Sequence, residues 1–198
     1  MRIVKACLTL FGLILSITTY CQEATYSKSA LKLGVGIGIN EGKREIGMGT
    51  LFSGGYQKSF WKDDRLRINP NLTIGGFMPF AITDNRDQYY RITSLGINGY
   101  LDALKFKSVA FFIGAGPFIN YSRGLLGTGG WSGYSDSEYF FRFYYGGYVG
   151  AGLRINPKNS RFAYEFAPIN VLAGNNSFVL GFLKMGIDIK LTAIANKD

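Results

Sequence analysis

Apolar residues recur at every second position along most of this chain, and no other feature limits its fold as strongly. In segment 30–40, Ile37 and Ile39 alternate with Gly36 and Gly38. A strict period of two with unlike faces is typical of a β-strand. The glycines do not match a dinucleotide-binding loop, because that motif needs the spacing G-x-G-x-x-G at the start of an apolar helix. The segment is therefore predicted to be a strand whose glycines share one face.

Eight segments share this extended pattern, and we find no helical period or linker between them. They span residues 30–40, 47–61, 66–80, 89–104, 108–123, 140–156, 161–172 and 177–193. Successive segments of this kind, separated by polar turns and loops, predict an all-β fold. The length of the chain favours a single domain.

The composition of the apolar faces of these segments indicates which side of the sheet contacts water. Outside segment 47–61 we assign no charged residue to them. A lysine or arginine that faces lipid at the bilayer midplane costs about 2–4 kcal/mol, whereas one that faces water costs almost nothing. We therefore predict that the apolar faces contact lipid and that Gly34, Gly36 and Gly38 point into a narrow lumen. Lys58 falls on an apolar face, which predicts either a bulge near Gly54 or a side chain that reaches the membrane interface.

Three prolines interrupt the predicted strands. Pro70, Pro117 and Pro168 each lack the N–H group that a sheet ladder needs. We expect bulges or positions at the rim of the sheet to accommodate them.

The connections between the segments alternate in length. Short polar turns occupy 62–65, 105–107 and 156–160, and longer connections occupy 41–46, 81–88 and 124–139. Outer-membrane barrels have short periplasmic turns, longer external loops and an even number of strands, so that both termini are periplasmic. These features predict an eight-stranded antiparallel up-and-down transmembrane β-barrel.

The N-terminal residues have the three parts of a secretory signal peptide. Arg2 and Lys5 precede an apolar run at 6–17, and a polar stretch ends near Cys21. We assign residues 1–21 to a removable signal and 22–198 to the barrel. Acylation of Cys21, as in a lipoprotein, is the alternative. Both cysteines of the chain lie in this segment, so the remaining barrel carries no thiol.

The whole pattern, from the signal through eight alternating strands with a G-x-G-P stretch at Gly114–Pro117, resembles the small bacterial outer-membrane β-barrels of the OmpA/OmpX type. The resemblance implies an outer-membrane location. The chain departs from these barrels at its end, because they usually finish on an aromatic residue, whereas this chain continues through 192–198.

The composition excludes several kinds of chemistry. The chain has no histidine, so a Ser-His-Asp triad, a Cys-His pair and an ordinary zinc site are absent. Lipid A deacylases and palmitoyltransferases of similar size depend on histidine and are disfavoured. We predict no catalytic residue, no cofactor and no metal.

Charged residues fall on the faces that we assign to the lumen. We expect them to form a network of ion pairs that fills it, with catalysis by a carboxylate pair as the alternative. The predicted network comprises Lys32, Arg67, Asp102, Arg142, Arg154, Arg161, Glu165, Lys184, Asp188 and Lys190.

The interior of an eight-stranded barrel is just wide enough for side chains, which disfavours a bulk porin. A narrow channel or transporter for a small amphipathic or anionic ligand is the second hypothesis. The third is a soluble periplasmic barrel that binds a hydrophobic ligand, and it requires the apolar faces to line the lumen.

The external connections are the best candidates for a function. Trp131 and Tyr134 lie on a glycine-rich and serine-rich stretch and offer contact area to a glycan or a protein. The chain carries 22 basic and 13 acidic residues, and this excess favours anionic lipid over nucleic acid in an exported protein. Four basic residues near the predicted outer rim suit lipopolysaccharide phosphates, namely Lys43, Arg44, Arg86 and Arg123. We predict a monomer with a structural or surface-interaction role.

Overall fold

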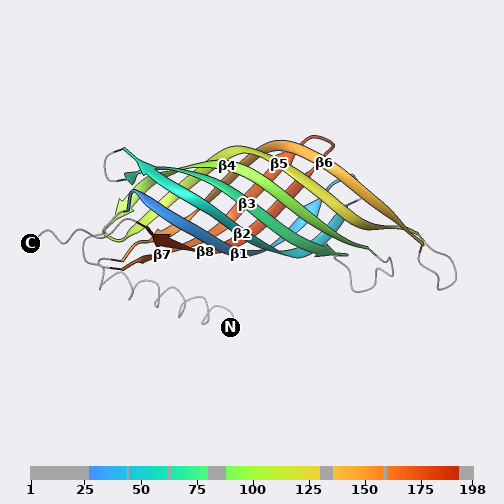
Figure 1. Ribbon diagram of the computed structural model, residues 1–198, viewed down its shortest axis with the longest axis horizontal. Coiled ribbons are helices and arrows are strands. Elements are labelled where there is room, and N and C mark those ends of the chain that lie inside the picture. Colours follow the sequence, from blue (N-terminus) through green and yellow to red (C-terminus); the bar gives the residue numbers. More distant parts are fainter. Residues whose placement is uncertain are drawn as a thin grey trace, which may run out of the picture.

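The computed structural model describes residues 27–43, 45–61, 64–79, 88–129, 136–157 and 160–191. Its strands are β1 (Ser29–Glu41), β2 (Ile46–Phe60), β3 (Leu66–Met78), β4 (Tyr89–Phe106), β5 (Val109–Gly129), β6 (Asp136–Ile155), β7 (Phe162–Gly174) and β8 (Val179–Lys190). Each strand pairs antiparallel with the next, and β8 pairs with β1 to close the barrel (Figure 1). The predicted eight-stranded all-β barrel is thus confirmed. Among the described residues, no helix is long and apolar enough to cross a membrane.

The two ends of the barrel differ. The turn end carries Ser29, Lys190 and the connections after β2, β4 and β6, and the loop end carries the connections after β1, β3, β5 and β7. The predicted signal segment, 1–21, lies outside the described residues.

The side chains alternate between the two faces as the sequence predicts. On β1, Val35, Ile37 and Ile39 point outward and are about half exposed, whereas the lumen holds buried polar and aromatic side chains such as Asn120 and Tyr144. This arrangement is opposite to the one that a soluble barrel with an apolar lumen requires. The period of two predicts the face of each side chain because successive residues of a strand face opposite sides of the sheet.

Four charged residues of the described strands are exposed on the outer face, namely Glu41 at the end of β1, Lys58, Arg91 and Arg123. Lys58 points outward two residues from the end of β2, with its amine 5.6 Å from the ring centre of Phe60. The pairing of β2 with β1 runs without a shift, so the alternative of a bulge near Gly54 is wrong. Arg91 and Arg123 are also exposed on the outer face near the loop end. Our assignment of a charge-free outer face beyond β2 is therefore wrong at that end, where the interfacial region tolerates charge.

The glycines of β1 give room to large inward side chains. A Cβ atom on Gly36 would stand 2.5 Å from the backbone oxygen of Leu183, which is closer than real side chains approach. On the opposite side of the lumen, the rings of Tyr100 and Phe112 pack edge to face with their centres 5.6 Å apart. Small residues facing large ones let eight strands close around a filled interior.

Asparagine amides compensate for two of the prolines. The β2–β3 pairing skips Tyr56 and Pro70, and the Asn69 side-chain amide donates to the Tyr56 carbonyl at 3.0 Å. The register of β7 on β8 shifts around Pro168, as predicted for a bulge. There the Asn170 amide donates to the Ala167 carbonyl at 2.8 Å. These side chains supply the donors that proline lacks.

Pro117 leaves a gap in the β4–β5 ladder. The pairing passes from Gly96 to Gly99 on β4 without Ile97 and Asn98. The register is unchanged on both sides of the gap, so the strand is interrupted without a bulge.

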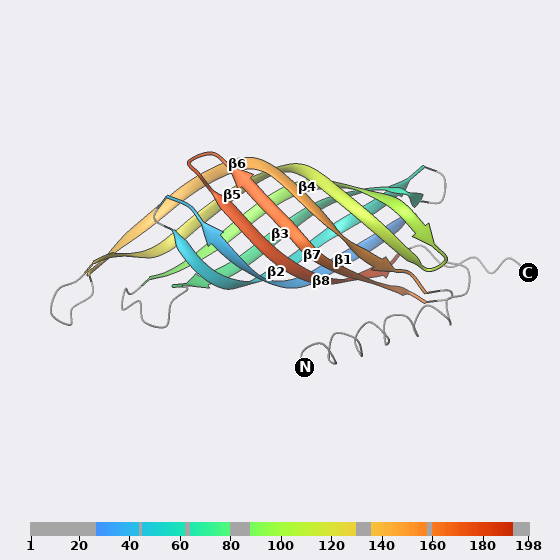
Figure 2. The same ribbon diagram turned by 180° about the vertical axis from the view of Figure 1, so that it is seen from behind.

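The hairpin of β5 and β6 is longer than predicted. We expected strands that end at 123 and begin at 140, but β5 continues to Gly129 and β6 begins at Asp136. The sequence pattern is obscured there because glycine and serine dilute the apolar period. Figure 2 shows this hairpin running past the β7–β8 turn at the loop end.

Two substitutions test the role of the inward glycines. We expect Gly36→Val to lower the free energy of unfolding by about 1–3 kcal/mol, because the added atoms crowd the backbone of β8 at Leu183. Gly147 has open space around its missing side chain, so Gly147→Val is expected to change that free energy by less than about 0.5 kcal/mol. Urea unfolding of the barrel in lipid vesicles measures both. Equal unfolding midpoints for the two variants would contradict this account of the glycines.

Candidate functional site

Arg67 is the centre of a charge network inside the turn end. Its guanidinium lies 2.7 Å from an Asp102 oxygen and 2.8 Å from a Glu165 oxygen, and it donates to the Gln57 amide oxygen at 3.1 Å. The rings of Tyr100 and Phe112 each lie 5.3 Å from its Cζ atom. Arg67 is fully buried, so these contacts replace its hydration.

Five further strands bring charges to the same level of the lumen. Lys32 on β1 contacts Glu165 and lies 3.4 Å from Asp188. Arg154 on β6 lies 3.0 Å from Asp188, and Lys105 on β4 lies 3.7 Å from Asp102. The register explains the convergence, because Asp188 stands directly opposite Lys32 in the β1–β8 pair, where unlike charges stabilise the sheet.

The geometry of this network argues against acid–base catalysis. Asp102, Glu165 and Asp188 each contact at least two cations. A carboxylate pair for catalysis instead needs environments that separate the protonation states of its two members. The arrangement therefore fills and closes the turn end.

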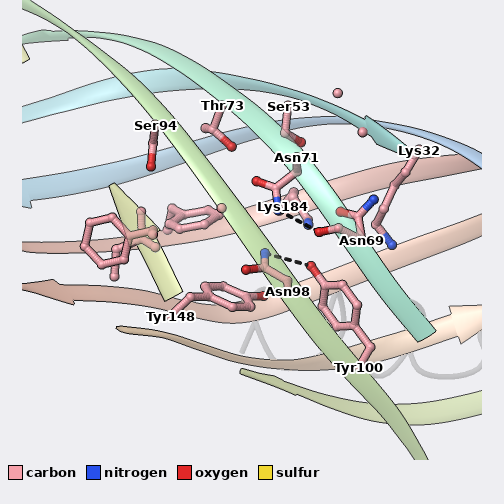
Figure 3. Close-up of a pocket in the computed structure, with 16 residues that line it drawn as sticks. Lys32, Ser53, Asn69, Asn71, Thr73, Ser94, Asn98, Tyr100, Tyr148 and Lys184 are labelled. Carbon is pink, nitrogen blue, oxygen red and sulfur yellow. Dashed lines mark hydrogen bonds between the residues drawn. The ribbon is translucent and has the colours of Figure 1, made fainter. Parts of the chain in front are cut away.

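A small cavity lined by polar and apolar side chains, Phe118, Leu172 and Phe182 among the latter, lies above the network in the middle of the lumen. Its volume is about 30 Å³, which holds roughly two water molecules. Figure 3 shows Lys184, Asn69 and Asn71 on one side of the cavity and the hydroxyl groups of Ser53 and Thr73 close by.

A second buried cluster closes the loop end. Glu45, in the connection between β1 and β2, is fully buried; it accepts a hydrogen bond from the Tyr144 hydroxyl and lies 3.3 Å from Arg142. Burial raises the pKa of Glu45 above its ordinary value, and the bonds from Tyr144 and Arg142 oppose that rise. Beside it, the Asn40 amide donates to the Tyr90 hydroxyl at 3.0 Å. The cluster ties the β1–β2 connection to β6 across the mouth of the barrel.

The edge of β6 is open above the β7–β8 turn. Pairing between β6 and β7 begins only at Gly146, and Asn175 of the turn binds both backbone groups of Tyr145 at 2.9 and 3.0 Å. Alternate residues of a strand direct their backbone groups to the same side. Tyr139, Phe141 and Phe143 therefore direct their N–H and C=O groups to this open edge, where no described strand pairs with them.

The structure distributes the predicted site residues over several places. Lys32, Arg67, Asp102, Arg154, Glu165 and Asp188 meet in the network, Lys190 is buried close to it, and Lys184 borders the cavity. Placing Arg142 in this network was wrong, because it lies at the loop end with Glu45. Placing Arg161 in the lumen was also wrong, because it lies just before β7, where the strand period no longer applies, and it is exposed.

The predicted loop candidates are only partly described. Lys43 is at the loop end, where its carbonyl accepts a hydrogen bond from Arg142. Arg123 faces outward opposite Arg91. Four candidates, Arg44, Arg86, Trp131 and Tyr134, lie outside the described residues.

Sequence reasoning missed three of the site residues. Glu45 lies in a connection, where no strand period assigns a face. Gln57 and Lys105 lie on strands, and the period places Gln57 on the inner face of β2. Gln57 was not predicted because it is uncharged, and the predicted network contained charged residues only. Lys105 was assigned to the turn at 105–107, which was wrong, because β4 continues to Phe106 after a register shift.

Comparison with known proteins identifies the fold. The structure of Neisserial surface protein A matches with a TM-score of 0.57 and 16% identity, over 83% of this chain and 98% of that one. Ail, the attachment invasion locus protein of Yersinia pestis, matches with a TM-score of 0.48 and 14% identity, over 83% of this chain and 99% of its own. No family model and no curated protein matches the sequence. The fold is that of the small eight-stranded outer-membrane β-barrels.

In the described part of the chain, no group of three or more acidic, cysteine or histidine residues is placed to hold a metal.

Replacing the central arginine tests the network. We expect Arg67→Met to lower the free energy of unfolding by about 3–5 kcal/mol, because Asp102 and Glu165 lose their main partner while they stay buried. Adding Asp102→Asn to that variant is expected to recover part of the loss. Arg161→Met, a control on an exposed arginine, is expected to change stability by less than about 0.5 kcal/mol. Urea unfolding in vesicles reports all three, and a double variant no more stable than Arg67→Met would contradict this interpretation of the network.

Proposed function

We propose that this chain is a non-enzymatic barrel of the bacterial outer membrane that binds a partner protein at the cell surface through the open edge of β6. The apolar outer face supports the membrane location, because exposed apolar side chains on every strand would be unfavourable in water. The fold shared with Neisserial surface protein A supports it as well. The filled turn end favours an anchoring role over passage of solutes.

The observation that carries the binding role is the unpaired stretch of β6. An open strand edge is a template on which an extended peptide adds as a further strand. Tyr139, Phe141 and Phe143 supply this edge, and their side chains are 62–69% exposed on the outer face. Backbone bonds would supply affinity and the aromatic row would select apolar residues at alternate positions of the partner.

The β5–β6 hairpin is held in place for such a role. On the inner face of β6, Tyr144 stacks on Phe178 with ring centres 4.5 Å apart, and Arg142 and Tyr144 bind Glu45. A binding strand fixed before the partner arrives loses less conformational entropy on binding.

Lipopolysaccharide is the proposed lipid partner. Arg91 and Arg123 stand opposite each other on β4 and β5 and are both exposed outward near the loop end. Like charges at opposed positions destabilise a sheet. A lipid phosphate between the two guanidinium groups would remove that repulsion through charge-assisted hydrogen bonds.

The second candidate function is a narrow path for a small amphipathic or anionic solute. The central cavity favours it, because polar side chains and Lys184 line that space. The Arg67 network opposes it, because its side chains fill the lumen below the cavity.

Cell fractionation tests the proposed location. We expect the full-length chain to stay in outer membranes after carbonate and urea washing, and to migrate differently on gels with and without boiling, because a closed barrel resists detergent until it is heated. A variant without residues 2–21 is expected to remain in the cytoplasm. Recovery of the full-length chain as a soluble periplasmic protein would contradict the proposal.

Peptide selection tests the β6 edge. We expect the barrel in lipid nanodiscs to select, from a displayed library of random linear peptides, sequences that alternate apolar and polar residues. Phe143→Pro removes one donor from the open edge and leaves the β5 side intact, so affinity is expected to fall about tenfold, as for the loss of one hydrogen bond.

The matched control for this experiment is Phe143→Leu. It keeps the backbone donor and an apolar side chain, and we expect it to bind within about threefold of the parent barrel, a difference of less than 1 kcal/mol. Selected peptides whose affinity is the same for the proline variant and the parent would refute binding at this edge.

A further inference from the structure

The lumen holds more positive than negative charge among the described residues. From the turn end to the central cavity, the inward or buried cationic side chains are Lys32, Arg67, Lys105, Arg154, Lys184 and Lys190, and the carboxylates are Asp102, Glu165 and Asp188. An uncompensated charge in an interior of low dielectric is costly. An excess of this kind favours a bound anion.

Lys184 makes no direct ion pair with the carboxylates of the network. Asp102 is held by Arg67 and Lys105, Glu165 by Arg67 and Lys32, and Asp188 by Lys32 and Arg154. Among the described residues, no hydrogen bond or ion pair involves the Lys184 amine. The carboxylates of Glu165 and Asp188 attract its charge, but neither of them contacts the amine directly.

The central cavity offers this amine a ligand site. Figure 3 shows the end of the Lys184 side chain beside Asn69 and Asn71 at the cavity wall. Hydroxyl groups of Ser53, Thr73 and Ser94 also border the space, all from different strands than Lys184. Hydroxyl and amide groups donate hydrogen bonds to an anion as readily as to water.

The size of the cavity limits the anion. A volume of about 30 Å³ corresponds to roughly two water-sized spheres, which admits a halide with one water. Sulfate and phosphate, with four oxygen atoms each, are too large. The walls are strands of a closed barrel, so they do not widen without breaking ladder hydrogen bonds.

We propose that this cavity is a halide-binding site in which the Lys184 amine is the counter-ion and the surrounding hydroxyl and amide groups complete the shell. Chloride is the abundant halide that would occupy it. The bound anion balances part of the excess positive charge and stabilises the closed barrel. The proposal concerns the lumen and is independent of the partner that binds β6.

Bromide replaces chloride in the test, because its anomalous X-ray scattering identifies it. In crystals of the barrel without its predicted signal, residues 22–198, grown with sodium bromide, we expect an anomalous peak within hydrogen-bond distance of Lys184 Nζ. Lys184→Met is expected to lose the peak. Lys190→Met removes a charge from the same end of the lumen but not from the cavity wall, and it is expected to keep the peak. Absence of the peak from the parent barrel, or its persistence in Lys184→Met, overturns the proposal.

Thermal unfolding gives a second measurement. At constant ionic strength, we expect replacement of sulfate by chloride or bromide to raise the midpoint of the parent barrel relative to that of Lys184→Met, because a ligand that binds only the folded state stabilises it. The general stabilisation of folded proteins by sulfate acts on both proteins and cancels in this difference. Equal changes of the midpoint in the two proteins overturn the proposal.

Discussion

The interior of a closed eight-stranded barrel has to be filled, and this constraint decides most of what the structure contains. Most exposed apolar side chains lie on the outer face, and the lumen is filled by aromatic and apolar side chains together with charged and polar groups that need partners. Arg67 meets that need by binding Asp102, Glu165 and Gln57 at once. The glycines of β1 follow from the same constraint, because Gly34 and Gly38 leave room for the side chains of Lys184 and Phe182 on the neighbouring strand. The side chains that fill the lumen are therefore also the ones that pair its charges.

The period of two was sufficient to predict the number of strands, their order and the face of most side chains. It failed where the backbone departs from a regular ladder. Arg161 was assigned to the lumen although it precedes β7, and Lys105 was missed because β4 shifts register before it. Glu45 lies in a connection, where burial depends on tertiary contacts with Arg142 and Tyr144. Local pattern identifies strands, but the partners of a lumen side chain come from strands up to 131 residues away, as for Gln57 and Asp188.

With the proposed function, the two ends of the barrel have different roles, which are stability at the turn end and recognition at the loop end. At the turn end, charges from six strands interlock, so local opening there would separate several ion pairs together. At the loop end, aromatic stacking between Tyr144 and Phe178 and between Phe77 and Tyr90 supports the hairpin from inside. Sites that bind partners are usually carried on a scaffold whose rigidity comes from elsewhere. The filled turn end is that scaffold here.

An open strand edge is normally a hazard, since identical edges can pair and aggregate. Natural sheets suppress such pairing with prolines, inward charges or cover from another segment. On β6 the open stretch from Tyr139 to Phe143 carries no proline, and its one inward arginine, Arg142, is engaged by Glu45 and the Lys43 carbonyl. In a soluble protein this edge would invite fibre formation. In a membrane-anchored barrel the copies share one orientation, which restricts how two such edges can meet. We propose that this anchoring leaves the edge, which no described strand covers, available to a different partner.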